Sequence, residues 1–336
     1  MLLFYTISEV YTTFGIVSAN ENFDFFENNV FKFIYSFHMP LFMLVSGYLF
    51  FFSCKKRNLK ELLVHRTQSI LQPLIMCTIL NYFLTYSIIN RSLKGIIDGP
   101  WVSTLNIYWF LWSVLSSSLA LGIIYKVTSK IAIRIFGLII GAFFVSLFPN
   151  WELNIFMYPF FVIGFLFAQY RERIPSAILK MRYVFLVLFP IMLLFYEKKH
   201  YIYTSGIVPS NNVMEILYID GFRWAIGLAG SIFMLVVVEL ICKWIFFKHP
   251  KLANPIAVLG KKSLQMYCIS VIILSFWLPV IYGKICRVVG TVSLVPNIYV
   301  YSFLFTPALA IIYSILIYYI VRFMEKTKLS KIIFGR

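Results

Sequence analysis

The sequence is short of charge, and above all of acidic residues. Only 13% of its 336 residues are charged and 61% are hydrophobic, and 13 Asp and Glu stand against 30 Lys and Arg. A soluble domain of this length could not bury so much apolar surface, so the composition favours a multi-pass membrane protein. The net charge of +17 then fits basic loops beside a lipid bilayer, and we expect no nucleic-acid partner.

Several residue patterns that mark enzymes and secreted domains are also missing. The five cysteines are odd in number and never form Cys-x-x-Cys, so we expect neither a disulfide framework nor a metal site. There is no Gly-x-Ser-x-Gly elbow, which argues against a serine hydrolase, and no glycosidase-like carboxylate pair within one helix. The first apolar run lacks a basic start and a cleavage site, so no cleavable signal peptide is expected.

What the sequence does have is a series of apolar runs of about twenty residues, the length that crosses a bilayer. They predict an all-α fold, a polytopic membrane helix bundle of about ten transmembrane helices in one domain over residues 1–336. The first run is the weakest, because Glu9 interrupts it. The expected spans are 1–19, 31–53, 69–90, 105–125, 131–149, 153–169, 182–197, 222–246, 256–281 and 298–322.

The distribution of Lys and Arg predicts the orientation of these spans. Basic residues gather in the cytoplasmic loops of multi-pass proteins. If the N-terminus is inside, the cytoplasmic segments hold 22 of the 30 Lys and Arg; these segments are 54–68, 126–134, 170–182, 243–262 and 322–336. Both termini are therefore expected in the cytoplasm, and His38 near the extracytoplasmic end of the second span.

His38 is the first candidate catalytic residue, because a titratable group at the edge of an apolar span is costly. A helix that begins near Met39 would have Pro40 in its first turn, where proline is best tolerated, with Phe42 and Ser46 on one stripe below His38. An imidazole can take a proton from a sugar hydroxyl near neutral pH. The alternative, that His38 only caps the helix, stays open. The other histidines lie in basic or loop surroundings and are expected to be solvated: His65, His200 and His249.

Other candidate residues carry positive charge or aromatic rings. The loop after the second span could contact lipid headgroups or bind the phosphates of coenzyme A, with Arg66 the best single candidate beside Lys55, Lys56 and Arg57. Trp109 and Trp112 could form an interfacial aromatic belt or a platform for a sugar ring. Arg223 could reach headgroups or face the bundle. Nearby glycines are expected to permit close helix packing: Gly227 and Gly230.

The stretch Phe37-His38-Met39-Pro40-Leu41-Phe42, followed by Ser46-Gly47-Tyr48, resembles the signature of the membrane-bound acyltransferase-3 family. The similar proteins include fucose 4-O-acetylase-like polysaccharide O-acetyltransferases. Weaker matching elements follow in the family's order: the basic loop up to Pro73, Trp109-Phe110-Leu111-Trp112, Arg223 to Gly230 and Gly260 to Tyr267.

The resemblance implies an O-acetyltransferase of the bacterial cytoplasmic (inner) membrane. Its donor would be cytoplasmic acetyl-CoA or another acyl-CoA, bound as a substrate and not as a permanent cofactor. Its acceptor would be a hydroxyl of a cell-surface or lipid-linked glycan. Here His38 would act as general base or acyl relay, and Arg66, Lys55, Lys56 and Arg57 would bind the donor. The acceptor side would be lined by Ser46, Tyr48, Trp109, Trp112, Arg223 and Tyr267.

Two departures from the family pattern leave alternatives open. Residues 1–37 contain no histidine, although family members typically carry one at the outer end of the first helix, and Tyr267 is followed by Cys-Ile-Ser where relatives often place a histidine. The start could be truncated, His38 could suffice, or catalysis could be lost. The rival functions are a non-catalytic relative in glycan-precursor transport and a glycan polymerase.

Overall fold

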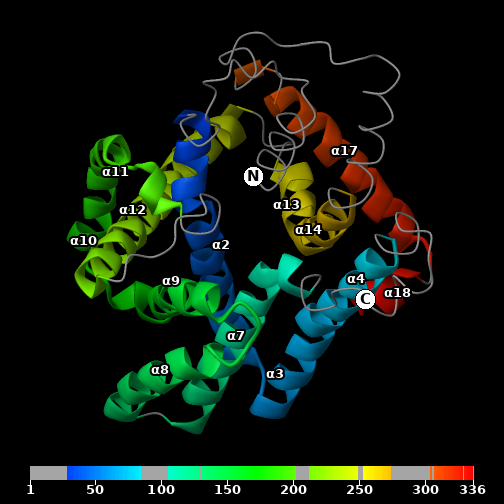
Figure 1. The fold of residues 1–336 in the computed structure, drawn as a ribbon, viewed down its shortest axis with the longest axis horizontal. Helices are drawn as coiled ribbons and strands as arrows, with labels where there is room; N and C mark the ends of the chain where they lie inside the picture. The colour runs from blue at the N-terminus through cyan, green and yellow to red at the C-terminus, as the bar shows by residue number, and fades with distance from the viewer. Residues whose placement is uncertain are drawn as a thin grey trace. The chain divides into compact units, whose positions relative to one another are not determined.

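A computed structural model describes residues 29–84, 105–128, 130–201, 212–248, 253–273, 303–304, 306–327 and 329–335. Within these ranges every regular element is a helix (Figure 1), which confirms the predicted all-α fold. The expected span 1–19 lies outside the described residues.

Five of the described helical stretches are long and apolar enough to cross a membrane, which confirms the membrane helix bundle. They are Asn29–Lys56, Trp109–Val127, Trp151–Arg173, Ser176–Leu194 and Val213–Ile245. Two shorter apolar stretches, Ala132–Val145 and Ser263–Ile272, lie within other expected spans. The count of ten stays a prediction.

The helix that carries His38 begins earlier than the proline suggested. Helix α2 runs from Asn29 to Lys56, so Pro40 lies in its interior and not in a first turn near Met39. Proline has no N–H, so the backbone carbonyl of Ser36 loses its intrahelical partner at this point. The prediction of a helix start near Met39 was wrong, because aromatic and aliphatic residues already continue the helix upstream.

The described residues fall into two compact units that interleave along the sequence. The first unit takes them from Phe23–Arg57 and Ile155–Ala253, the second from Asn58–Asn154 and Asn254–Arg336. A single domain over residues 1–336 stays a prediction.

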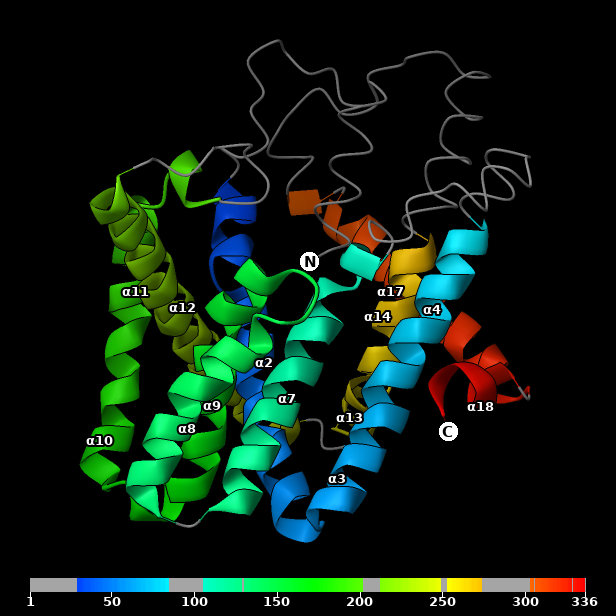
Figure 2. The ribbon, with the colours of Figure 1, turned by 60° about the horizontal axis from the view of Figure 1, so that its bottom comes forward.

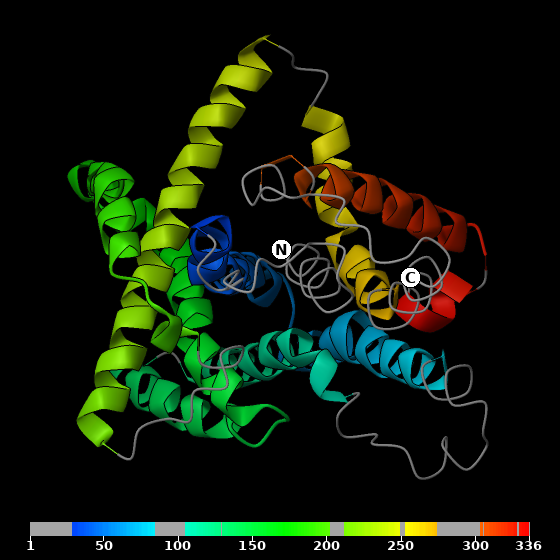
Figure 3. The ribbon, with the colours of Figure 1, turned by 45° about the horizontal axis from the view of Figure 1, so that its top comes forward.

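The first unit is built around α2. Its other helices are most of α9 (Trp151–Tyr170), then η4 (Arg171–Arg173), α10 (Ser176–Met181), η5 (Arg182–Val184), α11 (Phe185–Leu194), η6 (Lys198–His200) and α12 (Val213–Lys248). The long helix α12 runs beside α2 and also packs on α11 (Figure 3).

Glycines set the closest approaches within this unit. A Cβ on Gly47 of α2 would collide with the backbone carbonyl of Phe161 in α9, and one on Gly164 would collide with the carbonyl of Leu44 in α2. On α12, a Cβ on Gly227 would lie 2.9 Å from Pro40 Cγ. The glycines thus let α9 and α12 approach α2 closely, as predicted for Gly227.

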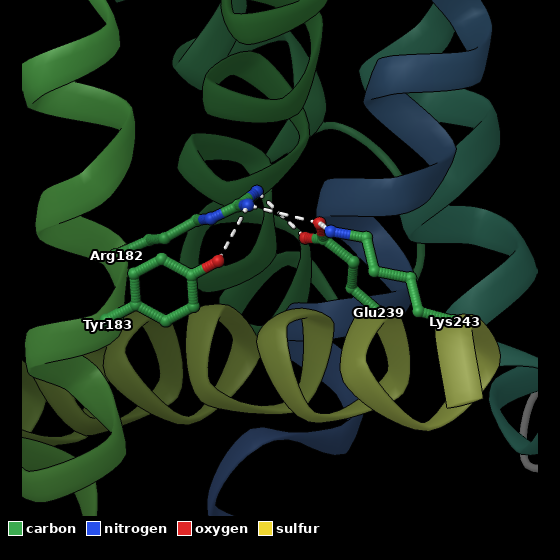
Figure 4. A network of polar contacts seen from close by, with 4 residues as sticks. All are labelled: Arg182, Tyr183, Glu239 and Lys243. Carbon is green, nitrogen blue, oxygen red and sulfur yellow. Dashed lines mark hydrogen bonds and ion pairs between the residues drawn. The ribbon is translucent and has the colours of Figure 1, made fainter.

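A polar network joins α12 to η5, the short helix before α11, at the Lys56 end of this unit (Figure 4). Arg182 forms a two-pronged ion pair with Glu239, with Nη1 2.9 Å from Oε2 and Nη2 3.1 Å from Oε1. Lys243 Nζ donates to the same Oε1 at 2.7 Å, one turn along α12. The carboxylate therefore ties two helices together at a partly exposed position.

The second unit contains α3 (Leu59–Arg66), η2 (Thr67–Leu71), α4 (Gln72–Phe83), α7 (Trp109–Val127), α8 (Ile131–Val145), α13 (Ala253–Lys261), α14 (Ser263–Ile272), α17 (Thr306–Glu325) and α18 (Leu329–Phe334). Helices α7 and α8 lie side by side, while α14 packs on α4 and α17 (Figure 2). The buried Ser113 hydroxyl donates a hydrogen bond to Asn154 Oδ1 at 2.6 Å, which fixes α7 against the first turn of α9.

Candidate functional site

His38 lies on α2 with its ring half-buried. Its Nδ1 is 3.3 Å from the backbone carbonyl oxygen of Tyr35. A carbonyl oxygen can only accept a hydrogen bond, so Nδ1 carries the proton in the neutral ring. This tautomer leaves the lone pair on Nε2, the nitrogen that can act as a base.

Aromatic rings form a wall beside His38 within the first unit. The Tyr35 ring lies 5.8 Å from the His38 ring and 5.0 Å from the ring of Tyr201, centroid to centroid. Tyr201 in turn stacks on Phe31 at 5.5 Å and meets Tyr196 edge-on at 5.0 Å. The wall joins α2 to the segment that follows α11.

Arg223 of α12 is buried at this same Asn29 end of the unit, with 8% of the residue exposed. Its Nε donates to the backbone carbonyl of His200 at 2.8 Å, and Nη1 pairs with Asp220 at 3.0 Å. The guanidinium carbon lies 4.8 Å from the centre of the Phe156 ring of α9. Three elements therefore hold this cation in one orientation.

The structure places His200 beside Arg223. The expectation that His200 is solvated was therefore wrong. The residue is 1% exposed and its ring packs 4.6 Å from Phe222. Its Nδ1 accepts a hydrogen bond from the backbone N–H of Glu197 at 2.9 Å. The proton of the neutral ring is therefore on Nε2, which is buried without a partner among the described residues. Burial, with a smaller effect from the charge of Lys199, lowers the pKa of His200 to about 4.

The other predicted residues of the first unit lie further along α2. Ser46 is two turns below His38 and half-buried. The Tyr48 hydroxyl accepts a hydrogen bond from Arg171 Nη1 at 3.0 Å, which directs its ring toward the end of α9. Lys55 and Lys56 are exposed in the last turn of α2, and Arg57 follows, with Nη1 donating to the Ser53 hydroxyl at 2.8 Å.

The remaining predicted residues belong to the second unit. Arg66 ends α3, half-buried, immediately before the widened turn η2. Trp112 packs on Phe148 at 6.1 Å, whereas Tyr267 of α14 lies 5.9 Å from Phe110. Trp109 is half-buried at the start of α7.

Two polar atoms of this second set are buried without partners. Within the part of the chain that the structure describes, neither Trp112 Nε1 nor the Tyr267 hydroxyl has a hydrogen-bond partner. Unsatisfied buried donors are rare in native proteins and call for an explanation such as a ligand or an ordered water. Both residues were predicted to line the acceptor side.

The structure thus brings His38 and Arg223 into one unit and adds His200, which sequence reasoning missed. A lone histidine after two lysines gives no local sign of burial; the rings of Phe222 and Tyr196 that cover it come from other elements. In the described ranges no group of three His, Cys, Asp or Glu could hold a metal ion.

Comparison with known proteins extends over most of the chain. Residues 8–319 match the family described as an acyltransferase domain. Nodulation protein NolL of Mesorhizobium japonicum is 29% identical over 168 residues, which cover 48% of this chain and 44% of that protein. Its namesake from Sinorhizobium fredii is 30% identical over 162 residues, 47% of this chain and 44% of that protein.

The matched part of this chain spans less than half the length of these curated relatives. No solved structure matches the chain. The family match, in contrast, covers the His38 stretch, the basic loop with Arg66, and the segments with Trp109, Arg223 and Tyr267 in one alignment. The chain therefore belongs to the acyltransferase-3 family of membrane proteins.

Proposed function

We propose that this protein is a membrane O-acyltransferase that moves an acetyl group from cytoplasmic acetyl-CoA to a hydroxyl of a cell-surface or lipid-linked glycan. The observation that carries the proposal is the hydrogen bond between His38 Nδ1 and the Tyr35 carbonyl. It selects the tautomer in which Nε2 is basic, at a position beside aromatic rings and in the same unit as the buried Arg223.

The chemistry requires a base and a fixed acceptor. As the acceptor oxygen attacks the thioester carbonyl, His38 Nε2 takes the hydroxyl proton; the new C–O bond forms, the C–S bond breaks, and the imidazolium returns the proton to the CoA thiolate. The rings of Tyr35 and Tyr201 offer apolar faces to the C–H side of a sugar. The guanidinium of Arg223 is held in place before the substrate binds, which limits the cost of binding.

The donor needs several fixed cations for its phosphates. Lys55, Lys56 and Arg57 lie at the opposite end of α2 from His38, and Arg66 ends the next helix. From Lys55 to His38 the helix rises about 26 Å, at roughly 1.5 Å per residue. We therefore propose that an extended pantetheine arm carries the thioester along the bundle to His38. There His38 acts as the base or, as an acyl relay, attacks the thioester carbonyl through Nε2, releases the CoA thiolate and passes the acyl group to the acceptor hydroxyl, whose proton goes to the thiolate.

The distribution of charge in the first unit supports this direction. The acidic residues Glu197 and Asp220 stand at the Asn29 end, while the Lys56 end is rich in Lys and Arg. By the positive-inside rule the Lys56 end faces the cytoplasm and His38 the outside, as expected for a protein of the bacterial inner membrane with both termini inside.

The test is transfer of radiolabelled acetyl from acetyl-CoA into surface glycan, in cells with and without the gene. We expect label to be lost on deletion and restored by the 336-residue protein but not by His38→Ala at equal expression. His65→Ala, on α3, is the matched control and should restore label. If His38→Ala restores full acetylation, the catalytic role is wrong. If deletion abolishes glycan export without an acetyl requirement, the protein acts in precursor transport.

A further inference from the structure

A widened helical turn separates Arg66 from α4. Residues Thr67–Leu71 form a π-helix, and the backbone N–H of Gln72 reaches back five residues to the carbonyl of Thr67. Such a turn inserts one residue into the helix, and π-turns are frequent at functional sites. One residue corresponds to about 100° of rotation, so this turn decides which way Arg66 points relative to α4.

The short helix α18 packs against this turn within the second unit. Gln72 Nε2 donates to the last carbonyls of α18, to Lys331 O at 3.2 Å and to Ile332 O at 2.8 Å. The Gln72 amide therefore caps the last turn of α18 from another element. Helix α18 also buries the side chains of Ile333 and Phe334, which are 7% and 3% exposed.

The end of α18 also meets the backbone of the π-turn. Gly335 has φ +68°, and a Cβ at this position would lie 2.8 Å from the carbonyl oxygen of Gln68. Its own N–H donates to the Lys331 carbonyl at 3.1 Å. Glycine is required here both for the left-handed conformation and for the close approach. We call Gln72 and Gly335 the α18 clamp.

We propose that the α18 clamp holds the π-turn in shape and so positions Arg66 for the phosphates of the acyl-CoA donor. Gln72 and Gly335 are positioning residues, since they act through Arg66 and need not touch the donor. The inference rests on the proposed function, because it assigns the clamp to the donor side of that reaction. The inference makes α18 part of the donor site, although α18 lies some 260 residues from Gln72 along the chain.

The experiment measures the donor KM and kcat of the purified full-length protein with acetyl-CoA. Gln72→Ala should raise the donor KM roughly tenfold, as expected for losing hydrogen bonds of ordinary strength, with kcat at saturating donor unchanged. Gly335→Ala should act in the same direction. Thr78→Val on α4 loses a hydrogen bond within its own helix, and Ile332→Gln alters an exposed side chain of α18; both controls should keep the wild-type KM.

A double-mutant cycle separates positioning from general damage. In an Arg66→Ala background, Gln72→Ala should have no further effect on the donor KM; additive effects, or an unchanged KM in Gln72→Ala alone, would overturn the inference. A wild-type protein that binds no acetyl-CoA would instead refute the proposed function. Amide hydrogen exchange at residues 67–72 then tests whether the α18 clamp stabilises the π-turn, independently of acetyl-CoA binding. Faster exchange in Gln72→Ala than in the wild type supports the α18 clamp, and equal exchange overturns it.

Discussion

The buried His200, which lies beside Arg223, should make the stability of the folded protein sensitive to acid. The substitution His200→Gln should remove part of this sensitivity. His200 is 1% exposed as a residue, and burial is the main reason that its pKa is lowered to about 4 in the folded protein. In the unfolded chain its pKa should be near 6.5. Between these two values the unfolded state binds more protons than the folded state, so the free energy of unfolding falls as the pH falls.

The size of the effect follows from the same difference in pKa. The contribution is fully present above pH 6.5 and is lost as the pH falls toward 4, with a maximum of about 3 kcal/mol at 1.36 kcal/mol per pH unit. The groups around the ring have opposing effects, because Lys199 and Arg223 disfavour the protonated imidazole while Glu197 favours it. Local opening of the η6 turn would expose the ring, so the measured loss of stability would stay below this maximum.

Thermal unfolding of the purified protein between pH 4 and pH 8 measures this contribution. Glutamine can still accept the hydrogen bond from the Glu197 N–H, but it does not titrate in this range. The melting temperature of His200→Gln should therefore fall less than that of the wild type as the pH drops from 6.5 to 4.5. The control is His65→Gln, on a half-buried helix position in the second unit. Parallel pH profiles for the wild type and His200→Gln would refute the reasoning.

Two further substitutions test what holds the first unit together. Gly47→Ala places a methyl group against the backbone carbonyl of Phe161. Because a backbone carbonyl cannot move aside as a side chain can, we expect a loss of stability of about 1–3 kcal/mol, measured as a lower melting temperature. An unchanged melting temperature would mean that α2 and α9 are not in close contact. Glu239→Gln removes the carboxylate that pairs with both Arg182 and Lys243. Because these ion pairs are partly exposed, the loss of stability should be about 1 kcal/mol and should shrink in high salt. A loss that does not depend on salt would contradict an ionic origin.

The sequence was sufficient for the fold class and for the long apolar helix that carries His38. Both depend on composition and local pattern, which long apolar runs express directly. The start of α2 was less accessible, because proline marks the first turn of many helices and Pro40 is an interior exception. The glycines beside it were interpreted correctly as packing positions, since small residues permit close helix approach in membranes.

Several polar contacts between elements could not be predicted, because they join segments far apart in the sequence. Nothing near Gln72 indicates that its amide caps a helix some 260 residues away. The burial of His200 depends on the rings of Tyr196, which follows α11, and of Phe222 in α12, whereas its tautomer is set locally by the backbone N–H of Glu197. Hydrogen bonds of this kind are set by tertiary structure and leave no periodic signal.

The geometry of α2 agrees with the proposed role of His38 in a stretch that otherwise serves packing. Phe37 and Pro40 face α12, where Cβ atoms on Gly230 and Gly227 would lie 2.6 Å and 2.9 Å from them, and Gly47 faces α9. His38 follows Phe37 by one residue, hence by about 100° around the helix, which turns its ring out of the α12 contact. Most substitutions in this stretch should therefore lower stability, and loss of activity in a protein that still folds should be concentrated at His38.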